Sequence, residues 1–388
     1  MVNLCRVAAL AGALFASTAV SHNDHALSPR ELEVRAERMR IARRGLGVCA
    51  ETLQARGWEK RNVDRRAKRA AAIRAKRNLP AAPWKKTKRD FEDVLGTNHN
   101  DTLKFPGANL DTPSSVFFGE DPTQACILTA EAMVGPYYVD GELIRNDIVE
   151  DQAGVPLYVD IQVLNIETCE PVPNMYTDLW HANSTGVYSG VIAEGNGNDD
   201  IEGNLNTTFG RGVYATDAEG VVEYHTIFPG HYIGRAVHMH VMTHEGGEVL
   251  PNNTFKSSQA SHVGQIYFDQ ALVDTVEATE PYTLNQQEDT FNADDRIMRE
   301  QADTSEADPV VHYIYLGEGV TDGVFAWTTL AVNRTSVQEV IPAVHWTENG
   351  GVKNPDAPSG PPGGGMPSGG FPSGLLGALP TGLRIFSP

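Results

Sequence analysis

The chain has 388 residues, a formal net charge of −19 at pH 7, and 41% hydrophobic and 21% charged residues. This length fits one large domain with appendages or two ordinary domains, and the composition is that of a globular protein rather than a disordered chain. The one notable apolar run lies near the N-terminus and is too short to span a bilayer, which argues against a membrane protein.

The charge is divided unevenly along the chain. Between Arg30 and Arg89 there are 20 basic and 6 acidic residues, a local balance of +14. From Asp90 onward there are 10 basic and 43 acidic residues, a balance of −33. A body this acidic repels the phosphates of nucleic acids, so we expect no nucleic-acid partner.

Residues 1–21 have the pattern of a secretory signal peptide. Arg6 supplies the positive charge, residues 7–14 form the apolar stretch, and small residues up to Ser21 offer cleavage sites. We therefore expect a secreted, extracellular glycoprotein, with the occupancy of its sequons left open. The Asn-x-Ser/Thr sequons begin at Asn100, Asn183, Asn206, Asn252 and Asn333.

Residues 22–90 form a basic arm that is predicted to be helical. A capping box with proline at the first helical position begins at Ser28, and the Arg/Lys/Ala-rich chain continues to about Asn78. The arm is either a removable pro-segment or inhibitory arm docked on the acidic body, or a solvated helical extension. Residues 91–120 are expected to be a linker. The dibasic pairs that a secretory protease would cut are Lys60-Arg61, Lys68-Arg69, Lys76-Arg77 and Lys88-Arg89.

Three cysteines remain after removal of the signal: Cys49, Cys126 and Cys169. An odd number in an oxidising compartment implies one disulfide and one spare thiol. We favour a bridge between Cys126 and Cys169, because both lie in the acidic body, although the spacings leave the pairing open.

Residues 121–345 are predicted to be all-β, an antiparallel β-sandwich. Residues 157–163 alternate between core-type and outward-facing side chains, which is the period of a strand. Long amphipathic helices are absent from the pattern of this segment. Residues 346–388 are Gly/Pro/Ser-rich and predict a disordered tail. Further strands are expected at 175–182, 221–228, 236–244, 263–268, 310–316 and 323–332.

The sharpest chemical pattern is the pair His238 and His240. On a strand, residues i and i+2 project from the same face, so the two imidazoles stand side by side, which suits a metal. A turn at 228–234 precedes the pair and aims Tyr232 back at it, and a strand at 178–182 runs into a Gly-rich bend with Tyr188 at its tip.

Together these segments resemble the intradiol ring-cleavage dioxygenase family, which opens catechols between the two hydroxyl-bearing carbons. The resemblance is carried, in the family's order, by residues 135–138, the run from Trp180 to Tyr188, residues 229–232 and Arg235-x-x-His238-x-His240. It is greatest for the secreted fungal members, which are similar to catechol and protocatechuate dioxygenases.

The resemblance implies one non-haem Fe(III), with Tyr188, Tyr232, His238 and His240 as ligands. Phenolate oxygens suit a hard ferric ion, and imidazole suits iron generally. An aromatic diol and O2 would be the substrates, and a cis,cis-muconate-type diacid the product. No other cofactor is implied.

Catalytic roles follow from the same resemblance for three residues. Tyr232 would leave the metal when the diol binds and take up a substrate proton, and Arg235 would stabilise carbanion character on the ring. Gln265 matches the family's active-site glutamine. The short stretch between Tyr232 and Arg235 suggests an open pocket that accepts substituted catechols, and leaves the natural catechol and a homodimer open.

Two other functions compete with this interpretation. Cleavage after Ser21 would place His22 at the N-terminus, where its amine and ring could clamp copper in an oxidoreductase. Alternatively, the protein is a secreted, non-catalytic β-sandwich binding module. Neither alternative explains the presence of all four ligands.

Overall fold

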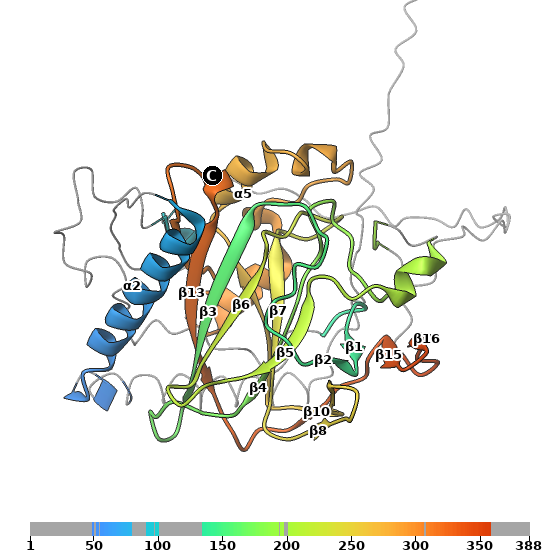
Figure 1. Ribbon diagram of the computed structural model, residues 1–388, viewed down its shortest axis with the longest axis horizontal. Helices are drawn as coiled ribbons and strands as arrows, with labels where there is room; N and C mark the ends of the chain where they lie inside the picture. The colour runs from blue at the N-terminus through green and yellow to red at the C-terminus, as the bar shows by residue number, and fades with distance from the viewer. Residues whose placement is uncertain are drawn as a thin grey trace, which may run out of the picture.

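The computed structural model describes 49, 52–53, 55–79, 91–96, 98–100, 134–193, 195–197, 201–305 and 308–357 (Figure 1). The predicted signal peptide 1–21, His22, the capping box at Ser28 and Cys126 lie outside the described residues, as does the chain beyond 357. Among the residues described, no helix is long and apolar enough to cross a membrane.

The described chain is mostly strand, and two four-stranded sheets form its centre. The sheet that we call the β3 sheet has the order β12-β13-β3-β6, and the β7 sheet has the order β11-β7-β4-β5. In the β3 sheet these strands are β12 (His312–Tyr315), β13 (Val324–Val332), β3 (Pro156–Asn165) and β6 (Val221–Ile227). In the β7 sheet they are β11 (His262–Tyr267), β7 (His238–His244), β4 (Tyr176–Trp180) and β5 (Arg211–Ala215).

Every predicted strand segment overlaps one of these strands, and β5 is the one that was not predicted. The expectation of purely antiparallel pairing is wrong, because β13 pairs with β3 in parallel from Val324↔Leu157 to Val332↔Asn165. The two strands are far apart in the chain, so no hairpin turn dictates their direction.

Three small strand groups surround the two sheets. They are β1 (Val139–Asp140), β15 (Val344–Thr347) and β16 (Gly350–Lys353); β2 (Glu142–Leu143), β9 (Thr254–Lys256) and β8 (Glu248–Val249); and β10 (Gln259–Ala260) with β14 (Gln338–Glu339). The strand β16 lies beyond the predicted domain end at 345, so the folded part extends into the segment assigned to the tail.

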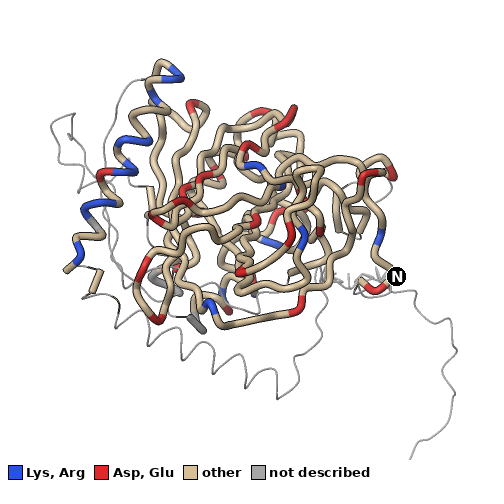
Figure 2. Tube along the Cα trace, turned by 60° about the horizontal axis from the view of Figure 1, so that its bottom comes forward, with Lys and Arg blue, Asp and Glu red and all other residues tan. Residues whose placement is uncertain are grey.

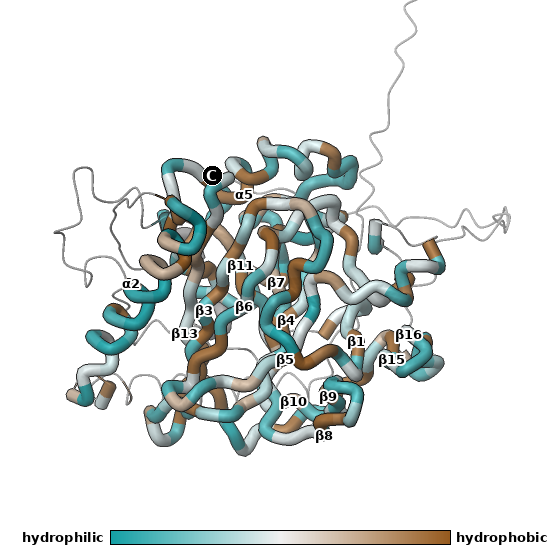
Figure 3. Tube along the Cα trace, in the orientation of Figure 1, coloured by the Kyte–Doolittle hydropathy of each residue, from teal (hydrophilic) through white to brown (hydrophobic). Residues whose placement is uncertain are grey.

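One apolar cluster takes side chains from both sheets. Val159 and Ile161 of β3 and Leu330 of β13 pack in the same cluster as Leu179 of β4 and Val241 of β7. Figure 3 shows these central strands as the most hydrophobic part of the molecule, with hydrophilic segments around them. The alternation predicted for 157–163 therefore points one set of side chains into a core between the sheets.

The opposite face of the β3 sheet is covered by the helix α2 (Trp58–Arg77) (Figure 1). Val63, Ala70 and Ile73 of α2 pack against a cluster that includes Phe325 and Trp327 of β13. This second layer explains why β3 is buried on both faces although its sequence alternates. Of the two alternatives for the arm, docking on the body is what the structure has, whereas its removal stays a prediction.

The arm also carries the disulfide, which joins Cys49 to Cys169 with their Cα atoms 5.1 Å apart. The predicted bridge between Cys126 and Cys169 is therefore wrong. The physical reason is packing: Leu53 and Trp58 are buried with Leu164 beside the bridge, which brings Cys49 to the body.

The remaining helical segments of the described chain are shorter than α2. They are α3 (Phe91–Gly96), α5 (Gln270–Glu277), α6 (Arg296–Ser305) and the 3-10 turns η2 (Glu202–Asn206), η3 (Tyr282–Leu284), η4 (Asn292–Asp294) and η5 (Val320–Asp322). The plain linker expected over 91–120 is incomplete as a description, because α3 contacts α6 and Asn100 forms a bridge with Tyr313.

Candidate metal centre

The two histidines lie at the start of β7, and the two tyrosines lie on the loops that lead to them. His238 and His240 alternate along β7 and so face the same side of the β7 sheet. Tyr232 lies in the connection between β6 and β7, and Tyr188 lies in the bend that follows β4. All four side chains are at most 2% exposed.

The four candidate ligands form one cluster of rings. The hydroxyl of Tyr232 lies 3.3 Å from Nε2 of His238, and that nitrogen lies 3.1 Å from Nε2 of His240. The Tyr188 ring stands edge-on to the Tyr232 ring at 5.3 Å and to the His240 ring at 5.9 Å between centroids. The structure thus brings together the four ligands that the sequence predicted.

Local backbone geometry holds the two tyrosine loops together. Gly186 has φ +77°, and a Cβ at this position would lie 2.0 Å from the carbonyl oxygen of His231. Only glycine tolerates both the conformation and this close approach. The backbone N–H of Gly230 also donates to the carbonyl of Asn183 at 3.0 Å, so the bend with Tyr188 and the turn with Tyr232 are fixed against each other.

Neighbouring groups orient the imidazoles. Nδ1 of His238 donates to the carbonyl of Ala236 at 2.7 Å, which leaves Nε2 with a lone pair directed at the cluster. The ring of His240 stacks on Trp180 at 4.7 Å with an interplanar angle of 7°. The facing Nε2 atoms of the two histidines need a proton or a cation between them, because two lone pairs repel.

Burial makes both phenols weak acids in the metal-free protein. Burial raises the pKa of Tyr188 well above its usual range, and the adjacent Tyr232 raises it further. Burial also raises the pKa of Tyr232 to about 12, against the opposing influence of the Arg235 guanidinium. Both hydroxyls are therefore neutral at pH 7, and a highly charged cation is needed to stabilise their phenolates.

Arg235 and Gln265 lie beside this cluster and touch each other. Nη2 of Arg235 donates to Oε1 of Gln265, and it also lies 2.8 Å from the hydroxyl of Tyr267. Nε of Arg235 donates to Asp295 at 2.8 Å, in an ion pair whose side chains are 4% and 0% exposed. Although burial acts in the other direction, Arg235 holds the pKa of Asp295 below its usual range, so the pair is charged.

Sequence reasoning missed Asp295 and Tyr267. Asp295 also accepts from the backbone N–H of Met298 at 2.8 Å, so it caps the first turn of α6. An aspartate directly before a helix was a signal that could have located the cap, but not its arginine partner. Tyr267 is two residues beyond Gln265 on β11 and shares its face, which was readable from the alternation.

Four other histidines of the described chain have ordinary partners. His181 bonds the Ala182 carbonyl at 2.8 Å and the Thr226 hydroxyl at 2.7 Å, and burial lowers its pKa to about 4. His231 pairs with Glu277 at 2.9 Å. His225 pairs with Asp147, and His244 bonds the carbonyl of Gln259.

The donor set fits a ferric ion in its chemistry. Two buried phenols and two imidazoles are hard or intermediate donors, and the hydroxyl of Tyr188 makes no hydrogen bond of good geometry to the described residues. In the described part of the chain, no group of three or more His, Cys, Asp or Glu side chains is placed to hold a metal. Tyrosine oxygens are thus essential to any metal site at this cluster.

An aromatic ring, Tyr137, packs against the two candidate tyrosine ligands. The Tyr137 ring stacks on Tyr188 at 4.5 Å and meets Tyr232 edge-on at 5.7 Å. A Cβ at Gly195 would lie 3.2 Å from the Tyr137 hydroxyl, so a neighbouring loop packs over this ring. The open pocket that the short stretch after Tyr232 suggests stays a prediction.

Comparison with known proteins identifies the central segment. Residues 133–281 match the protein-family model described as Dioxygenase. No curated protein matches the chain.

Several solved structures are similar to part of the chain. An intradiol ring-cleavage dioxygenase from Tetranychus urticae is 23% identical, over 54% of this chain and 95% of that one, with a TM-score of 0.42. The dioxygenase domain of a carbohydrate-binding fusion from Streptomyces sp. SirexAA-E is 22% identical, over 52% and 95%, with a TM-score of 0.33. The 3-chlorocatechol 1,2-dioxygenase from Rhodococcus opacus 1CP is 18% identical, over 53% and 71%, with a TM-score of 0.32.

Proposed function

We propose that residues 133–281, which match the family model described as Dioxygenase, form an intradiol ring-cleavage dioxygenase that cleaves catechol-type diols with O2 at an Fe(III) held by Tyr188, Tyr232, His238 and His240. The observation that carries the proposal is the buried cluster of two phenols and two imidazoles, with Nε2 of both histidines and the hydroxyl of Tyr232 within 3.3 Å of a neighbour. Burying four polar rings in one cluster costs free energy, so packing alone does not account for this combination.

The chemistry divides between the metal and the protein. Fe(III), when bound, supplies a Lewis acid that chelates both oxygens of a diol and withdraws electron density from its ring. Burial raises the pKa of Tyr232 to about 12 without a metal, so its phenolate would be basic enough to accept a proton from the diol. Tyr188 would be the other phenolate that holds the metal.

Arg235 and Gln265 serve the organic substrate. The buried guanidinium of Arg235 stays protonated beside the cluster because the carboxylate of Asp295 pairs with it. Gln265 accepts a hydrogen bond from the same guanidinium. A fixed positive charge in a dry site stabilises negative charge that develops on a ring next to it. Burial of these groups excludes water from the reacting atoms.

The proposal extends to the setting of the enzyme. A secreted protein is supported by the apolar N-terminal stretch at 7–14 and by the disulfide between Cys49 and Cys169, since disulfides persist in oxidising compartments. A two-layer β-sandwich is supported by the apolar cluster shared between the β3 and β7 sheets. The substrate is an aromatic diol, and a homodimer is compatible with this chain.

The visible spectrum tests the proposal. The purified, air-exposed protein is expected to be red, with about one iron per chain, because phenolate bound to Fe(III) gives a charge-transfer band. Catechol added under nitrogen should shift the band. Tyr188→Phe should lose most of the colour and of the activity, whereas Tyr214→Phe, which changes a 41% exposed tyrosine of β5, should keep both. A protein that stays colourless after reconstitution with iron would sink the proposal.

A further inference from the structure

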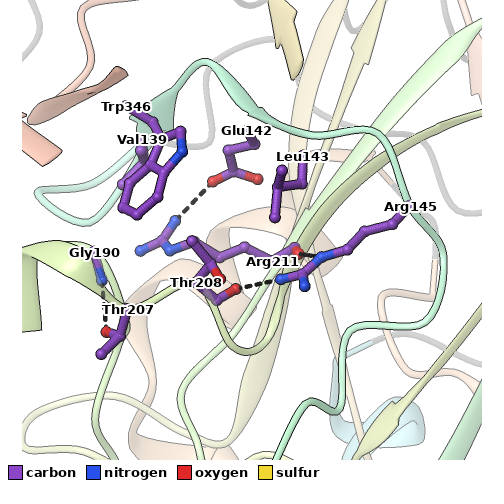
Figure 4. A pocket seen from close by; sticks show the side chains of 9 residues that line it. All are labelled: Val139, Glu142, Leu143, Arg145, Gly190, Thr207, Thr208, Arg211 and Trp346. Carbon is purple, nitrogen blue, oxygen red and sulfur yellow. Dashed lines mark hydrogen bonds and ion pairs between the residues drawn. The ribbon is translucent and has the colours of Figure 1, made fainter. Parts of the chain in front are cut away.

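A small cavity lies beside Gly190, two residues beyond Tyr188 (Figure 4). Glu142, Arg145, Gly190, Arg211 and Trp346 are among the residues that line it. Its volume of ≈ 10 Å³ leaves room for about one water molecule, so it is too small for an organic ligand. The charged groups around it therefore act on the protein itself.

Arg211 uses all three of its guanidinium nitrogens inside the protein. Nη1 donates to Glu142 at 3.0 Å, in an ion pair whose side chains are both 3% exposed. Nη2 donates to the carbonyl of Tyr137 at 2.6 Å. Nε lies 2.9 Å from the carbonyl of Ser189 and 3.1 Å from its hydroxyl. Figure 4 shows the guanidinium of Arg211 directed toward Glu142, whereas that of Arg145 is directed toward the carbonyls of Arg211 and Thr208.

The two backbone partners of Arg211 lie in the chain segments that carry two stacked rings, those of Tyr137 and Tyr188. Tyr137 stacks on Tyr188 at 4.5 Å with an interplanar angle of 19°, and Ser189 directly follows Tyr188. The guanidinium of Arg211 thus connects the backbone of Tyr137 to the backbone that directly follows Tyr188. The planar fork of arginine can reach both carbonyls at once, whereas the point charge of a lysine cannot.

The β7 sheet extends this connection to the imidazoles. Arg211 of β5 pairs in register with Trp180 of β4, which pairs with His240 of β7. Residues directly opposite each other in a sheet lie on the same face, and Trp180 stacks on His240. Arg211, Trp180 and His240 therefore form a row across three neighbouring strands, and the candidate ligand His240 is the last residue of this row.

From these contacts we infer that Arg211, anchored by Glu142, is a positioning residue that sets the orientation of the Tyr188 phenol toward the metal. The inference rests on the proposed iron site. It does not place Arg211 in contact with substrate or metal.

Arg145 offers a matched control in the same cavity. Its guanidinium donates to the carbonyls of Arg211 at 3.1 Å and Thr208 at 2.7 Å, and it pairs with Glu150. Neither carbonyl belongs to Tyr137 or Ser189. A lysine at 145 thus changes the cavity without touching the two segments that Arg211 joins.

The test compares Arg211→Lys with Arg145→Lys in two states of the full chain. In the metal-free protein labelled with 13C-tyrosine, the ring resonances of Tyr137 and Tyr188, identified with the variants Tyr137→Phe and Tyr188→Phe, should move in Arg211→Lys and stay in Arg145→Lys. With Fe(III), Arg211→Lys should shift the charge-transfer band and bind iron about 10–100-fold more weakly. Should Arg211→Lys fail to fold, Ser189→Ala removes one contact of Nε and should move the same resonances by less.

Two results would overturn the inference. Wild-type ring resonances in a folded Arg211→Lys protein would mean that the guanidinium does not set the phenol. Equal displacement in both lysine variants would mean that the cavity matters only as packing. Failure of the wild-type protein to bind Fe(III) is a different outcome, because it defeats the proposed function and leaves the ring resonances to decide the positioning by themselves.

Discussion

The metal centre on the β7 sheet and the contact between α2 and the β3 sheet are built in opposite ways. The centre takes its four candidate ligands from a single stretch of chain, from Tyr188 to His240, and packs them as buried rings. The α2 contact joins segments that are far apart in sequence, and it does so with charge. Arg65 pairs with Asp160, 95 residues away, and Arg69 pairs with Glu223, 154 residues away.

Figure 2 shows this contrast as a row of basic residues along α2 beside acidic residues of the body. Arg66 is fully buried there, 3.5 Å from Asp160 and with its guanidinium carbon 5.6 Å from the Trp327 ring centroid. The uneven charge of the sequence is thus explained by attachment of the arm. The difference teaches that the four candidate ligands are local in sequence, whereas the attachment of the arm joins distant segments.

The largest effect is expected from breaking the charge balance of the centre itself. Asp295→Asn leaves the buried guanidinium of Arg235 without its counter-charge, and removing one partner of a buried pair costs about 3–5 kcal/mol. Chemical denaturation should report this loss in the free energy of unfolding. The value of kcat/KM should fall by about 10²-fold, because a displaced Arg235 no longer faces the ring.

Asp294→Asn is the control for that variant, since Asp294 is an adjacent but exposed acid. It should change the free energy of unfolding by less than about 0.5 kcal/mol. Equal stability of the two variants would contradict a structural role for the pair between Arg235 and Asp295.

A smaller effect is expected from breaking the α2 contact. Asp160→Asn removes the shared partner of Arg65 and Arg66. The free energy of unfolding should fall by about 3 kcal/mol, the lower end for a buried pair, because Arg65 is partly exposed. Hydrogen exchange of α2 should accelerate while the charge-transfer band of the centre stays in place.

The matched change within α2 is Asp64→Asn, which removes an exposed pair with Lys60 at 2.6 Å. Such i, i+4 pairs contribute about 0.3–0.5 kcal/mol. A shift of the charge-transfer band in Asp160→Asn would show that the α2 contact and the metal centre are coupled. It would contradict the expectation that the two regions are independent.

The same contrast explains what could be predicted from the sequence. Tyr188, Tyr232, His238, His240, Arg235 and Gln265 were named from short motifs, and the structure places them together. Strand alternation is enough to put His238 beside His240, and glycine at 186 marks the tight bend near Tyr188. Period-2 patterns likewise located seven of the eight strands of the two main sheets.

What could not be predicted depends on pairing between distant segments. Asp295 and Arg211 look like surface charges until the register of the sheet and the cap of α6 bring them inward. The disulfide partner of Cys169 was misjudged because spacing says nothing of how the arm packs. The parallel pairing of β13 with β3 has the same origin.

The smallest expected effect concerns His99, which lies before the β-sheet body in sequence and contacts that body. Its ring is buried between the carboxylates of Asp269 and Asp308, with His312 edge-on at 5.6 Å. Burial disfavours the charged imidazole, but the carboxylates of Asp308 and Asp269 outweigh it and raise the pKa of His99 above its usual 6.5. The folded state therefore holds this proton more tightly than the unfolded state.

The sign of the pH dependence follows from that difference. The contribution of His99 is fully present below pH 6.5, the unfolded value, and is lost as the pH rises through the raised folded pKa. Protection of residues 91–100 against hydrogen exchange, corrected for the intrinsic rate, should fall with rising pH by at most about tenfold per pH unit, because one proton is involved. His99→Gln should lack this dependence. Protection that rises with pH would contradict the charged pairing, and a change in the charge-transfer band over the same range would link this contact to the centre.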